Sequence, residues 1–493
     1  MTNPLFIAVD LGAGSGRVFL VGVGPGEFSL EEIHRFHYPP RVKDGHLRWD
    51  FWYIFAEIKS GLSRAAARAK DLERGVQSIG IDSWAVDYGL INADGNLIAD
   101  PVCYRDSRTS GAMEEVFARV PHNLIFEKTG IQFQNFNTLY QVWTEGKNLG
   151  KAEKLLLLPD LINFFLTDQA AAEFTNATTT QMINASSGSW DFDLLQCLGL
   201  PVRILPEIVP AGRELGELKP KIASELSLPG VRIIAPATHD TGSAVAAAPI
   251  PPNWAYISSG TWSLIGVERH EPLINDEVAR QNFTNEGGVY GTTRFLKNVM
   301  GLWIFESCRR EWKAKAIDIE YDSIIRDVSR RKGFPAFIFP DDERFLNPLS
   351  MLDAIAEQFR ETGQKFDEDP VTIAKVIFDS LSFRYASILR SIESLTGLRL
   401  DGIQVLGGGG RNSYLNQMTA NASGLMVKAG LSEATVVGNA LVQAISARRF
   451  DSLSEAREHV AECFEFEEYV PQSSLELADA AIRYAEIENQ FIN

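Results

Sequence analysis

Short apolar runs separated by turns of small residues mark the beginning of the chain. The run Phe6–Val9 predicts one strand, and the run Arg17–Val21 predicts a second. Residues 10–16 between them read DLGAGSG, and such a cluster of glycines and small residues is typical of a turn. We therefore predict a β-hairpin at the start of the chain.

The same pattern returns in the second half of the chain. A proline cluster at 249–252 ends a small-residue helix predicted over 241–248, because proline cannot continue a helix. Beyond it, apolar strands predicted at 254–257 and 262–267 flank a turn of small residues at 258–261. Two strand–turn–strand units about 250 residues apart suggest an internal duplication in which both halves begin alike.

Apolar periodicity predicts further elements. Apolar residues from Ile373 to Ile392 recur at helical spacing, and Gly397 is a suitable end for that helix. The segment 106–200 reads as mostly helix and loop. The other predicted elements are helices at about 50–69, from 412, at 433–449 and at 473–490, strands at 78–82, 231–235 and 403–406, a hairpin closed by Asp94-Gly95, and a loop leading into a helix at 296–303.

Length and composition bound the class of protein. The 493 residues allow two to four domains, and we expect two, 1–246 and 247–493. Hydrophobic residues make up 45% of the chain, which excludes intrinsic disorder. The net charge of −17 argues against nucleic acid or an anionic membrane surface as a partner. A small anionic ligand is still compatible, because local backbone N–H groups can hold a phosphate whatever the net charge.

Cysteine usage and the N-terminus point to the cytoplasm. The cysteines are far apart and form no Cys-x-x-Cys or Cys/His cluster, so we expect neither a disulfide framework nor a zinc site. The N-terminus has no basic segment followed by a long apolar run. No uncharged apolar stretch reaches the roughly 20 residues of a membrane span. We therefore expect a cytoplasmic protein.

The first candidate for chemistry is the loop from Asp10 to Arg17. Its alternating glycines would let several backbone N–H groups point at one spot, as in a phosphate-binding nest. A carboxylate such as Asp10 at a strand end can hold Mg²⁺. The loop lacks the Gly-Lys-Ser/Thr of a P-loop, and a strand rather than a helix follows it, unlike a dinucleotide fingerprint. A flexible hairpin turn is the alternative.

The second candidate is Thr238-His239-Asp240-Thr241, where a strand meets a helix. The positive end of the helix favours an ionised Asp240 and offers N–H groups to an anion. Asp240 as a simple N-cap, with His239 as a packed histidine, is the alternative. Further candidates, each with a purely structural alternative, are the turn Ser259–Thr261, the glycine run 407–410, the segment 80–87 with its two carboxylates and an indole, and Asn298, whose amide can read sugar hydroxyls.

In their joint order these residues resemble the FGGY family of carbohydrate kinases, which have an actin-like ATPase fold. The resemblance runs over nearly the whole chain. Its most specific stretches are AVDLGAGSGRV (8–18), SIGIDSWAVD (78–87), YRDSRT (104–109), FNTLYQ (136–141), TNATTTQ (175–181), THDTGSAV (238–245), SSGTWSL (258–264), TNEGG (284–288), LKNVMGLW (296–303) and LGGGGRN (406–412). His239 stands where most members of the family have glycine.

The resemblance implies an α/β fold of two actin-like (ribonuclease H-like) domains around a central nucleotide and sugar cleft. The N-terminal domain would bind the sugar and carry the first phosphate loop, and the C-terminal domain would carry the second loop and bind adenosine. Asp240 matches the catalytic base and Asp10 the carboxylate near the metal. The sugar contacts implied are Ala85, His239, Asp240, Thr241 and Asn298. The ATP contacts implied are Ala13, Gly14, Ser15, Gly16, Arg17, Thr261, Glu306 and Gly409.

Three positions depart from the pattern that we expect in the best-matching members of the family. Position 85 is Ala where Gly is expected, so a methyl group reaches a sugar-facing backbone. Position 306 is Glu where a nucleotide-contacting Gln is expected, and position 14 is Gly where Ser is expected.

The resemblance also implies the reaction. We expect ATP- and Mg²⁺-dependent phosphorylation of a ketose, L-rhamnulose, at O1, by a monomer or homodimer without nucleic-acid or membrane partners. The alternatives are a related ketose such as L-fuculose or L-xylulose, and a non-catalytic actin-like ATP-binding protein.

Overall fold

The computed structural model describes residues 3–492, and the chain divides into two compact units. Unit 1 contains the chain up to Pro249 and two later segments, Glu268–Phe295 and Glu433–Phe464. Unit 2 consists of Ile250–Val267, Leu296–Ser432 and the chain from Glu465 onward. The chain thus first leaves unit 1 inside the proline cluster, close to the predicted boundary at 246/247, and later returns to unit 1 twice.

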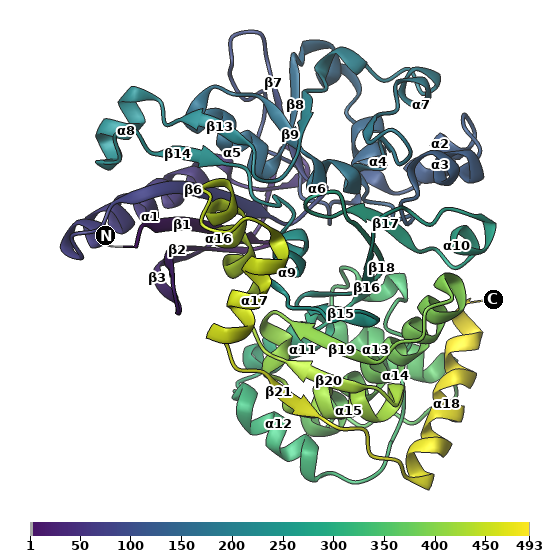
Figure 1. Cartoon of the computed structure of the whole chain (residues 1–493). Coiled ribbons are helices and arrows are strands. Elements are labelled where there is room, and N and C mark those ends of the chain that lie inside the picture. Colours follow the sequence, from purple (N-terminus) through teal and green to yellow (C-terminus); the bar gives the residue numbers. More distant parts are fainter. Residues whose placement is uncertain (1–2, 493) are drawn as a thin grey trace. The chain divides into compact units, whose positions relative to one another are not determined.

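Unit 1 is built on a six-stranded sheet (Figure 1). In order across the sheet its strands are β13 (Glu214–Glu217), β14 (Arg232–Ile234), β6 (Val76–Ser83), β1 (Leu5–Gly12), β2 (Ser15–Gly24) and β3 (Glu27–His37). β14, β6 and β1 run parallel to one another, and β2 runs antiparallel to β1. The predicted hairpin at the start of the chain is confirmed as β1 and β2.

Helices cover both faces of this sheet because its strands are apolar on both sides. On one face, Phe6 and Phe19 pack against apolar residues of α16 (Ala434–Ser446), which lies beside β1 although it is far away in the sequence (Figure 1). On the other face, Val18 packs against Gly61 of α1 (Phe51–Asp71). The predicted helices at 50–69 and 433–449 are therefore confirmed, and both support the strand that carries Asp10.

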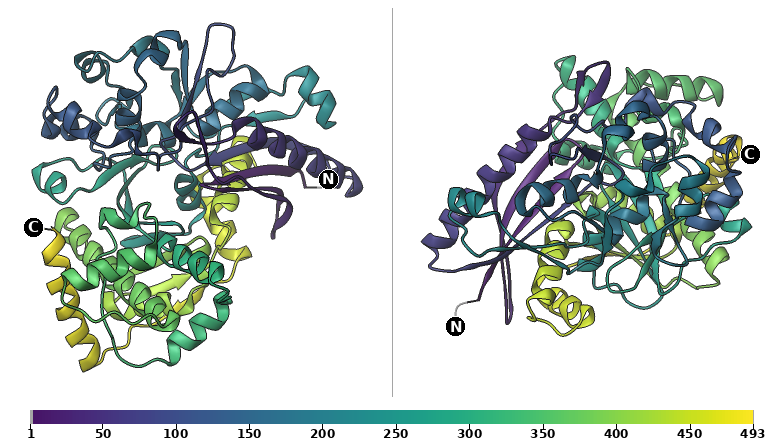
Figure 2. Two further views of the ribbon diagram at one scale, coloured as in Figure 1. Left: turned by 180° about the vertical axis from the view of Figure 1, so that it is seen from behind. Right: turned by 90° about the horizontal axis from the view of Figure 1, so that it is seen from above.

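Unit 2 contains most of a seven-stranded sheet (Figure 2). In order its strands are β17 (Thr284–Gly287), β18 (Thr293–Met300), β16 (Trp262–Arg269), β15 (Trp254–Ser259), β19 (Gly402–Leu406), β20 (Met426–Ala429) and β21 (Glu467–Tyr469). β15, β19 and β20 are parallel, whereas β16 and β21 pair antiparallel with their neighbours.

The two sheets share one strand order, which confirms the internal duplication predicted from the sequence. Read from β20 to β18, the second sheet repeats the first, read from β14 to β3, in sequence order, and the strand directions agree through β16. The antiparallel edge strands differ, because β13 precedes β14 in the chain whereas β21 follows β20. β1 and β15 thus occupy equivalent positions, and the turn that follows each is a candidate phosphate loop.

The remaining elements surround these sheets. In unit 1 the other helices are α2 (Ala112–Phe117), α3 (His122–Thr129), α4 (Thr138–Trp143), α5 (Leu158–Thr167), α6 (Phe174–Ala177), α7 (Phe192–Cys197), α8 (Pro220–Leu226), α9 (Asp240–Ala247), α10 (Asp276–Arg280) and α17 (Leu453–Cys463). In unit 2 the helices are α11 (Trp303–Ala314), α12 (Tyr321–Arg330), α13 (Met351–Glu361), α14 (Pro370–Thr396), α15 (Ser413–Ser423) and α18 (Leu475–Ile492). The small two-stranded sheets pair β4 (Arg41–Lys43) with β5 (His46–Arg48), β7 (Tyr88–Ile91) with β8 (Lys154–Leu157), β9 (Ala171–Glu173) with β12 (Glu207–Val209), and β10 (Ile183–Asn184) with β11 (Ser189–Trp190).

Two predicted elements differ from the structure. The segment 296–303 was expected to be a loop entering a helix, but most of it belongs to strand β18, and the helix begins only at Trp303. The Asp94-Gly95 turn is present, yet the residues after it make only a single bridge, Ile91–Leu97. β7 pairs instead with β8, because register with a distant strand is not encoded in the local turn. Among residues 3–492, no helix combines the length and apolar composition that crossing a membrane requires.

Candidate active site

Asp240 is the first residue of α9. The N-cap position belongs to His239, whose side chain makes no capping hydrogen bond, so Asp240 is not the N-cap of this helix. Its Oδ1 accepts hydrogen bonds from Thr241 N at 2.5 Å and from Thr241 Oγ1 at 3.2 Å. Oδ2 accepts no hydrogen bond from the described residues, and 31% of the side chain is exposed. One carboxylate oxygen is therefore held while the other stays accessible.

The surroundings of Asp240 shift its acidity. Burial, assisted by the nearby Asp10 carboxylate, raises the pKa of Asp240 above the ordinary value, while His239 and the hydrogen bonds from Thr241 oppose this shift. A carboxylate with a raised pKa is a stronger base and accepts a proton from a hydroxyl more readily.

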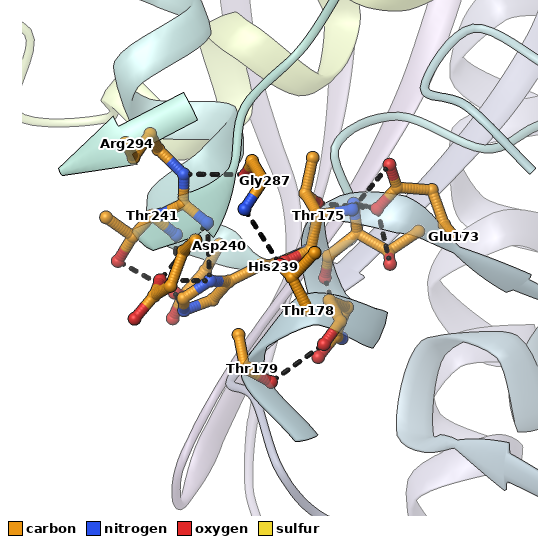
Figure 3. A network of polar contacts seen from close by, with 12 residues as sticks. Glu173, Thr175, Thr178, Thr179, His239, Asp240, Thr241, Gly287 and Arg294 are labelled. Atoms are coloured by element: carbon orange, nitrogen blue, oxygen red, sulfur yellow. Dashed lines mark hydrogen bonds and ion pairs between the residues drawn. The ribbon is translucent and has the colours of Figure 1, made fainter. Parts of the chain in front are cut away.

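The imidazole of His239 is held between charged groups (Figure 3). Its Nε2 lies 3.4 Å from Asp240 Oδ1. Its Nδ1 lies 3.0 Å from Arg294 Nη2 and 3.4 Å from Glu286 Oε2. Arg294 and Glu286 also pair with each other, at 3.2 Å, and both side chains are buried.

A buried carboxylate fixes the backbone that leads into Asp240 (Figure 3). Glu173 accepts hydrogen bonds from the backbone and the hydroxyl of Thr238, and from the backbone and the hydroxyl of Thr175. The backbone N–H of His239 in turn donates to Thr175 Oγ1, with an N–O distance of 3.3 Å. These bonds give partners to the N–H and hydroxyl groups of Thr175 and Thr238 and to the N–H of His239, and so hold the turn in place.

The end of β6 lies beside this turn. Ser83 donates its N–H to Thr238 O at 2.9 Å and forms a parallel bridge with His239. Two residues further on, Ala85 is half-buried, and its carbonyl accepts from Asp87 N. The structure thus brings the predicted sugar-contact segment around Ala85 close to His239 and Asp240.

Asp87 organises the aromatic residues of this segment. Its Oδ2 accepts from the indole nitrogens of Trp49 at 2.7 Å and Trp84 at 2.9 Å. Burial raises the pKa of Asp87 to about 6, although these hydrogen bonds oppose the shift. Asp87 therefore serves the packing of two indoles next to Ala85.

The loop after β1 is a tight turn at Ala13 and Gly14. Gly14 has φ of 133°, a conformation that only glycine adopts readily, and its N–H donates to Gly12 O at 2.7 Å. The hydroxyl of Tyr38 donates to Gly12 O at 2.6 Å and so stabilises the turn. Glycine at position 16 is needed for a different reason: a Cβ there would lie 2.4 Å from the ring of Phe36.

Arg17 joins the loop to the start of α16. Its guanidinium forms ion pairs with Asp10 and with Glu433. Across the described chain, no three His, Cys, Asp or Glu side chains come together as a metal site. Mg²⁺ needs no such set, since in proteins it usually keeps several waters and binds through only one or two carboxylates. Asp10 provides a carboxylate of that kind.

Asp82 lies beside Asp10 in the sheet, because β1 and β6 pair these two residues. Asp82 is fully buried, and its Oδ2 accepts from Asn439 Nδ2 of α16 at 2.5 Å, while Oδ1 has no hydrogen-bond partner among the described residues. Burial and the carboxylate of Asp10 raise the pKa of Asp82 well above the ordinary value. Its surroundings therefore disfavour the ionised form of Asp82 relative to an exposed aspartate.

In unit 2, Thr261 occupies the turn between β15 and β16. Its carbonyl accepts from Gly301 N at 3.1 Å and from Trp303 N at 3.2 Å, at the start of α11. The residue itself is exposed. The turn is thus fixed by its backbone, and the side chain of Thr261 is exposed.

The glycine run 407–410 forms a short 3₁₀ turn (Gly408–Arg411) after β19. Gly407 has φ of 80°, which favours glycine. A Cβ at Gly409 would lie 2.0 Å from Ser259 Oγ and 3.0 Å from Ser259 O. The sequence left the run open as a candidate ligand contact or a purely structural connection, and the structure shows that two of its glycines are required by the fold.

The last two predicted contacts lie on β18 and α11. Asn298 is half-buried on β18. Both carboxylate oxygens of Glu306 accept from Arg309 Nη1, one turn further along α11, at 3.0 Å. The charge that distinguishes Glu306 from the expected Gln is therefore balanced by a neighbour on the same helix.

Sequence reasoning missed several charged residues of the site. Glu286 lies in the quoted stretch 284–288, and Arg294 lies just before 296–303, yet neither was assigned a role. Glu173 and Glu433 were missed as well. In the sequence each of them is a charged residue beside an apolar strand. Such a residue can be given a role only once its partner in the fold is known.

Comparisons with known proteins cover both halves of the chain. Residues 5–247 match the N-terminal domain of the FGGY family of carbohydrate kinases, and residues 255–447 match its C-terminal domain. A rhamnulokinase of Bacteroides thetaiotaomicron is 41% identical over 472 residues, which cover 95% of this chain and 96% of that protein. A rhamnulokinase of Lactiplantibacillus plantarum is 39% identical over 472 residues, covering 95% of both.

Solved structures of sugar kinases have the same fold. A gluconate kinase from Lactobacillus acidophilus aligns with a TM-score of 0.81 at 17% identity, over 100% of this chain and 99% of that one. A xylulose kinase from the same organism aligns with a TM-score of 0.80 at 16% identity, over 99% and 98%. At such low identity the likeness concerns the fold alone.

Proposed function

The chain belongs to the FGGY family of carbohydrate kinases, and from this premise we propose that it phosphorylates L-rhamnulose at O1 with ATP, giving L-rhamnulose 1-phosphate and ADP. The observation that carries the proposal is the identity of about 40% with proteins named rhamnulokinase over nearly the whole length of both. The geometry around Asp240 fits a proton acceptor. We further propose a cytoplasmic monomer or homodimer.

Asp240 is the proposed base. In phosphoryl transfer the protein chiefly positions groups and stabilises charge, and one Asp accepts the proton of the attacking hydroxyl. The accessible Oδ2 of Asp240 would accept the proton of the 1-hydroxyl as O1 attacks the γ-phosphorus, the bond to the ADP oxygen breaks, and ADP leaves. The held Oδ1 fixes the direction of Oδ2. Ala85, His239, Thr241 and Asn298 are the proposed sugar contacts.

The two hairpin turns are the proposed phosphate contacts. They are equivalent by the internal duplication, and each is braced through its backbone, at Gly12 by Tyr38 and at Thr261 by α11. Donors that are rigid before the ligand arrives lose little entropy on binding it. The proposed ATP contacts are Ala13, Gly14, Ser15, Gly16, Arg17, Thr261, Glu306 and Gly409. Asp10 is the proposed ligand of Mg²⁺, which when bound would neutralise charge on the phosphates.

A panel of ketoses tests the substrate. L-Rhamnulose, L-fuculose, L-xylulose and D-xylulose are incubated with enzyme, ATP and Mg²⁺, ADP release is followed, and the phosphate position in the product is read by ³¹P and ¹³C NMR. We expect the highest kcat/KM for L-rhamnulose, with phosphate on O1. A higher kcat/KM for another ketose would reassign the substrate, and Ala85→Gly would then show whether the extra methyl group is the cause. ATP binding without sugar-dependent ADP release would favour a non-catalytic protein.

A further inference from the structure

Arg294 is an arginine whose burial needs an explanation. Its side chain is 0% exposed, and it extends from the first residues of β18 toward His239 (Figure 3). Nε donates to Gly287 O at 2.9 Å, and Nη2 reaches Nδ1 of His239 at 3.0 Å. Nη1 is buried without a hydrogen-bond partner among the described residues. A buried donor without a partner destabilises the folded state, so stability alone does not account for this arginine.

The guanidinium of Arg294 determines which nitrogen of the His239 ring carries the proton. Arginine has only donors, so the contact between Nη2 and Nδ1 requires that Nδ1 of His239 accepts. An imidazole that accepts at Nδ1 is neutral and carries its proton on Nε2. We propose that Arg294 is a positioning residue that keeps His239 in the neutral Nε2–H form. The role assigned to His239 and Asp240 rests on the proposed kinase function.

Two other charged groups face the ring, and both fit this proposal. Glu286 Oε2 also lies near Nδ1, at 3.4 Å, and by itself would draw a proton onto that nitrogen. Arg294 Nη2 is closer to Nδ1 and pairs with the same Glu286 oxygen at 3.2 Å, so the guanidinium balances the charge of this carboxylate. On the other side, Nε2 faces Asp240 Oδ1 at 3.4 Å, and a proton on Nε2 is directed there.

The consequence concerns the strength of the base. A cationic imidazole next to Asp240 would stabilise the ionised carboxylate and so weaken it as a proton acceptor. A neutral imidazole gives a weaker Coulombic effect, yet its N–H still orients the carboxylate or a sugar hydroxyl. Arg294 would thereby preserve the basicity of Asp240 without contacting the sugar.

The protonation state can be read directly. The protein is labelled with ¹⁵N-histidine, and two-bond ¹H–¹⁵N spectra are recorded from pH 6 to 8. The sequence has seven histidines, so His239→Gln identifies the signal. We expect an unprotonated Nδ1 and a protonated Nε2 for His239. A protonated Nδ1 in the wild-type protein would overturn the proposal. This measurement needs no turnover, so it decides the proposal even if the substrate assignment fails.

Variants separate positioning from structural support. Arg294→Met removes the donor, and we expect His239 to gain a proton at Nδ1, with kcat at least about tenfold lower and KM for ATP within about twofold. Arg294→Lys keeps a donor-only cation and should recover part of kcat and the Nε2–H signal. Thr178→Val is the matched control, because Thr178 accepts at 2.8 Å from the N–H of Gly287, the residue whose carbonyl accepts from Arg294, and makes no hydrogen bond to the ring.

The outcomes are distinguishable. An unchanged ¹⁵N pattern in Arg294→Met, or a loss of kcat in Thr178→Val as large as in Arg294→Met, would contradict a positioning role. If Arg294→Met does not fold, the wild-type and Arg294→Lys spectra decide the question. If the spectrum shows His239 with its proton on Nε2 but the protein phosphorylates no ketose, the proposed function is refuted and the tautomer assignment stands.

Discussion

At the scale of single residues, the site depends on which oxygen of a carboxylate is occupied. Thr241 engages Oδ1 of Asp240 through its N–H and its hydroxyl, and His239 approaches the same oxygen. Oδ2 remains for an incoming hydroxyl. The same contrast explains why Asp87, whose Oδ2 accepts from two indoles, is a packing residue although it too lies near the sugar-contact segment.

Replacing Asp240 by Asn tests the assignment of the base. The amide keeps the size of the side chain but cannot accept the proton, so we expect kcat to fall by about 10²–10⁴-fold. Ketose binding, measured by calorimetry in the absence of ATP, should stay within about threefold of wild type. Thr241→Val, which removes the hydroxyl contact to Oδ1 and alters a proposed sugar contact, should raise KM for the ketose with a much smaller loss of kcat than Asp240→Asn. Turnover of Asp240→Asn within tenfold of the wild-type rate would rule out this role.

The raised pKa of Asp240 predicts a pH dependence of activity. The base must be ionised, so kcat should decline as pH falls through the pKa of Asp240, and the decline should begin above the ordinary range of an aspartate, about 3.9. Kinetics from pH 4.5 to 8 with saturating ATP and sugar check this. An acid limb centred at or below the ordinary value would contradict the expectation.

The same shift affects stability in the opposite sense. Because the folded-state pKa is raised, the folded chain holds this proton more tightly than the unfolded chain does. The contribution to the free energy of unfolding is therefore full below the unfolded pKa and is lost as pH rises through the folded pKa. We expect Asp240→Asn to have a higher Tm than wild type at pH 7.5, with the difference vanishing toward pH 4 in thermal melts. An equal or lower Tm at pH 7.5 would contradict it.

At the scale of elements, the turns after β1, β15 and β19 are rigid. Their glycines serve the backbone rather than flexibility: Gly14 and Gly407 adopt positive φ, and Gly16 and Gly409 lie against a neighbouring side chain. A turn held by its backbone places its N–H groups before any ligand binds, which suits the phosphate contacts proposed for each turn.

Gly409 and Gly408 form a matched pair for testing this rigidity. Alanine at 409 would meet Ser259 Oγ at 2.0 Å and the Ser259 carbonyl at 3.0 Å, so the turn must move and we expect a loss of about 1–3 kcal/mol in unfolding free energy together with a higher KM for ATP. Alanine at 408 meets nothing within 4 Å and should leave both values nearly unchanged. Urea unfolding and initial-rate kinetics provide the readouts. Equal behaviour of the two variants would show that the close contact is unimportant.

At the scale of the whole molecule, each unit is assembled from segments that are distant in the chain. The strand order of the first sheet returns in the second, yet unit 1 also needs Glu433–Phe464. α16 from that segment covers Phe6 and Phe19, supplies Asn439 to Asp82, and is preceded by Glu433, which pairs with Arg17. The end of the sequence therefore completes the loop at its beginning.

A fragment experiment tests this interdependence. Residues 1–249 expressed alone would leave the face of the sheet containing Phe6 and Phe19 uncovered, so we expect no cooperative thermal transition and strong binding of an apolar dye. The full chain, melted under the same conditions, is the reference. A sharp melting transition of the fragment, without dye binding, would mean that α16 is dispensable for the fold of unit 1.

The local pattern of apolar and polar residues was enough to predict many of the strands and helices of this protein. Alternation of apolar residues and clusters of small residues predicted both hairpins, the long helices and the duplication, because strand and helix periods are properties of neighbouring residues. The position of Asp240 at a helix start was also predictable, since the strand before it and the small residues after it are adjacent in the chain. The strand at 293–300 was missed although β17 precedes it closely in the chain, because its residues, TRFLKNVM, do not alternate between apolar and polar.

The sequence by itself therefore determined the elements, their duplication and, through the family resemblance, the proposed base. Only the tertiary structure decided that Arg294 reaches His239, that Glu433 pairs with Arg17, and that Gly16 and Gly409 are required by packing against Phe36 and Ser259. The physical reason is that a side-chain contact depends on the distance between residues in space. Propensity and periodicity describe neighbours in the chain and carry no information about which distant charged groups the fold brings together.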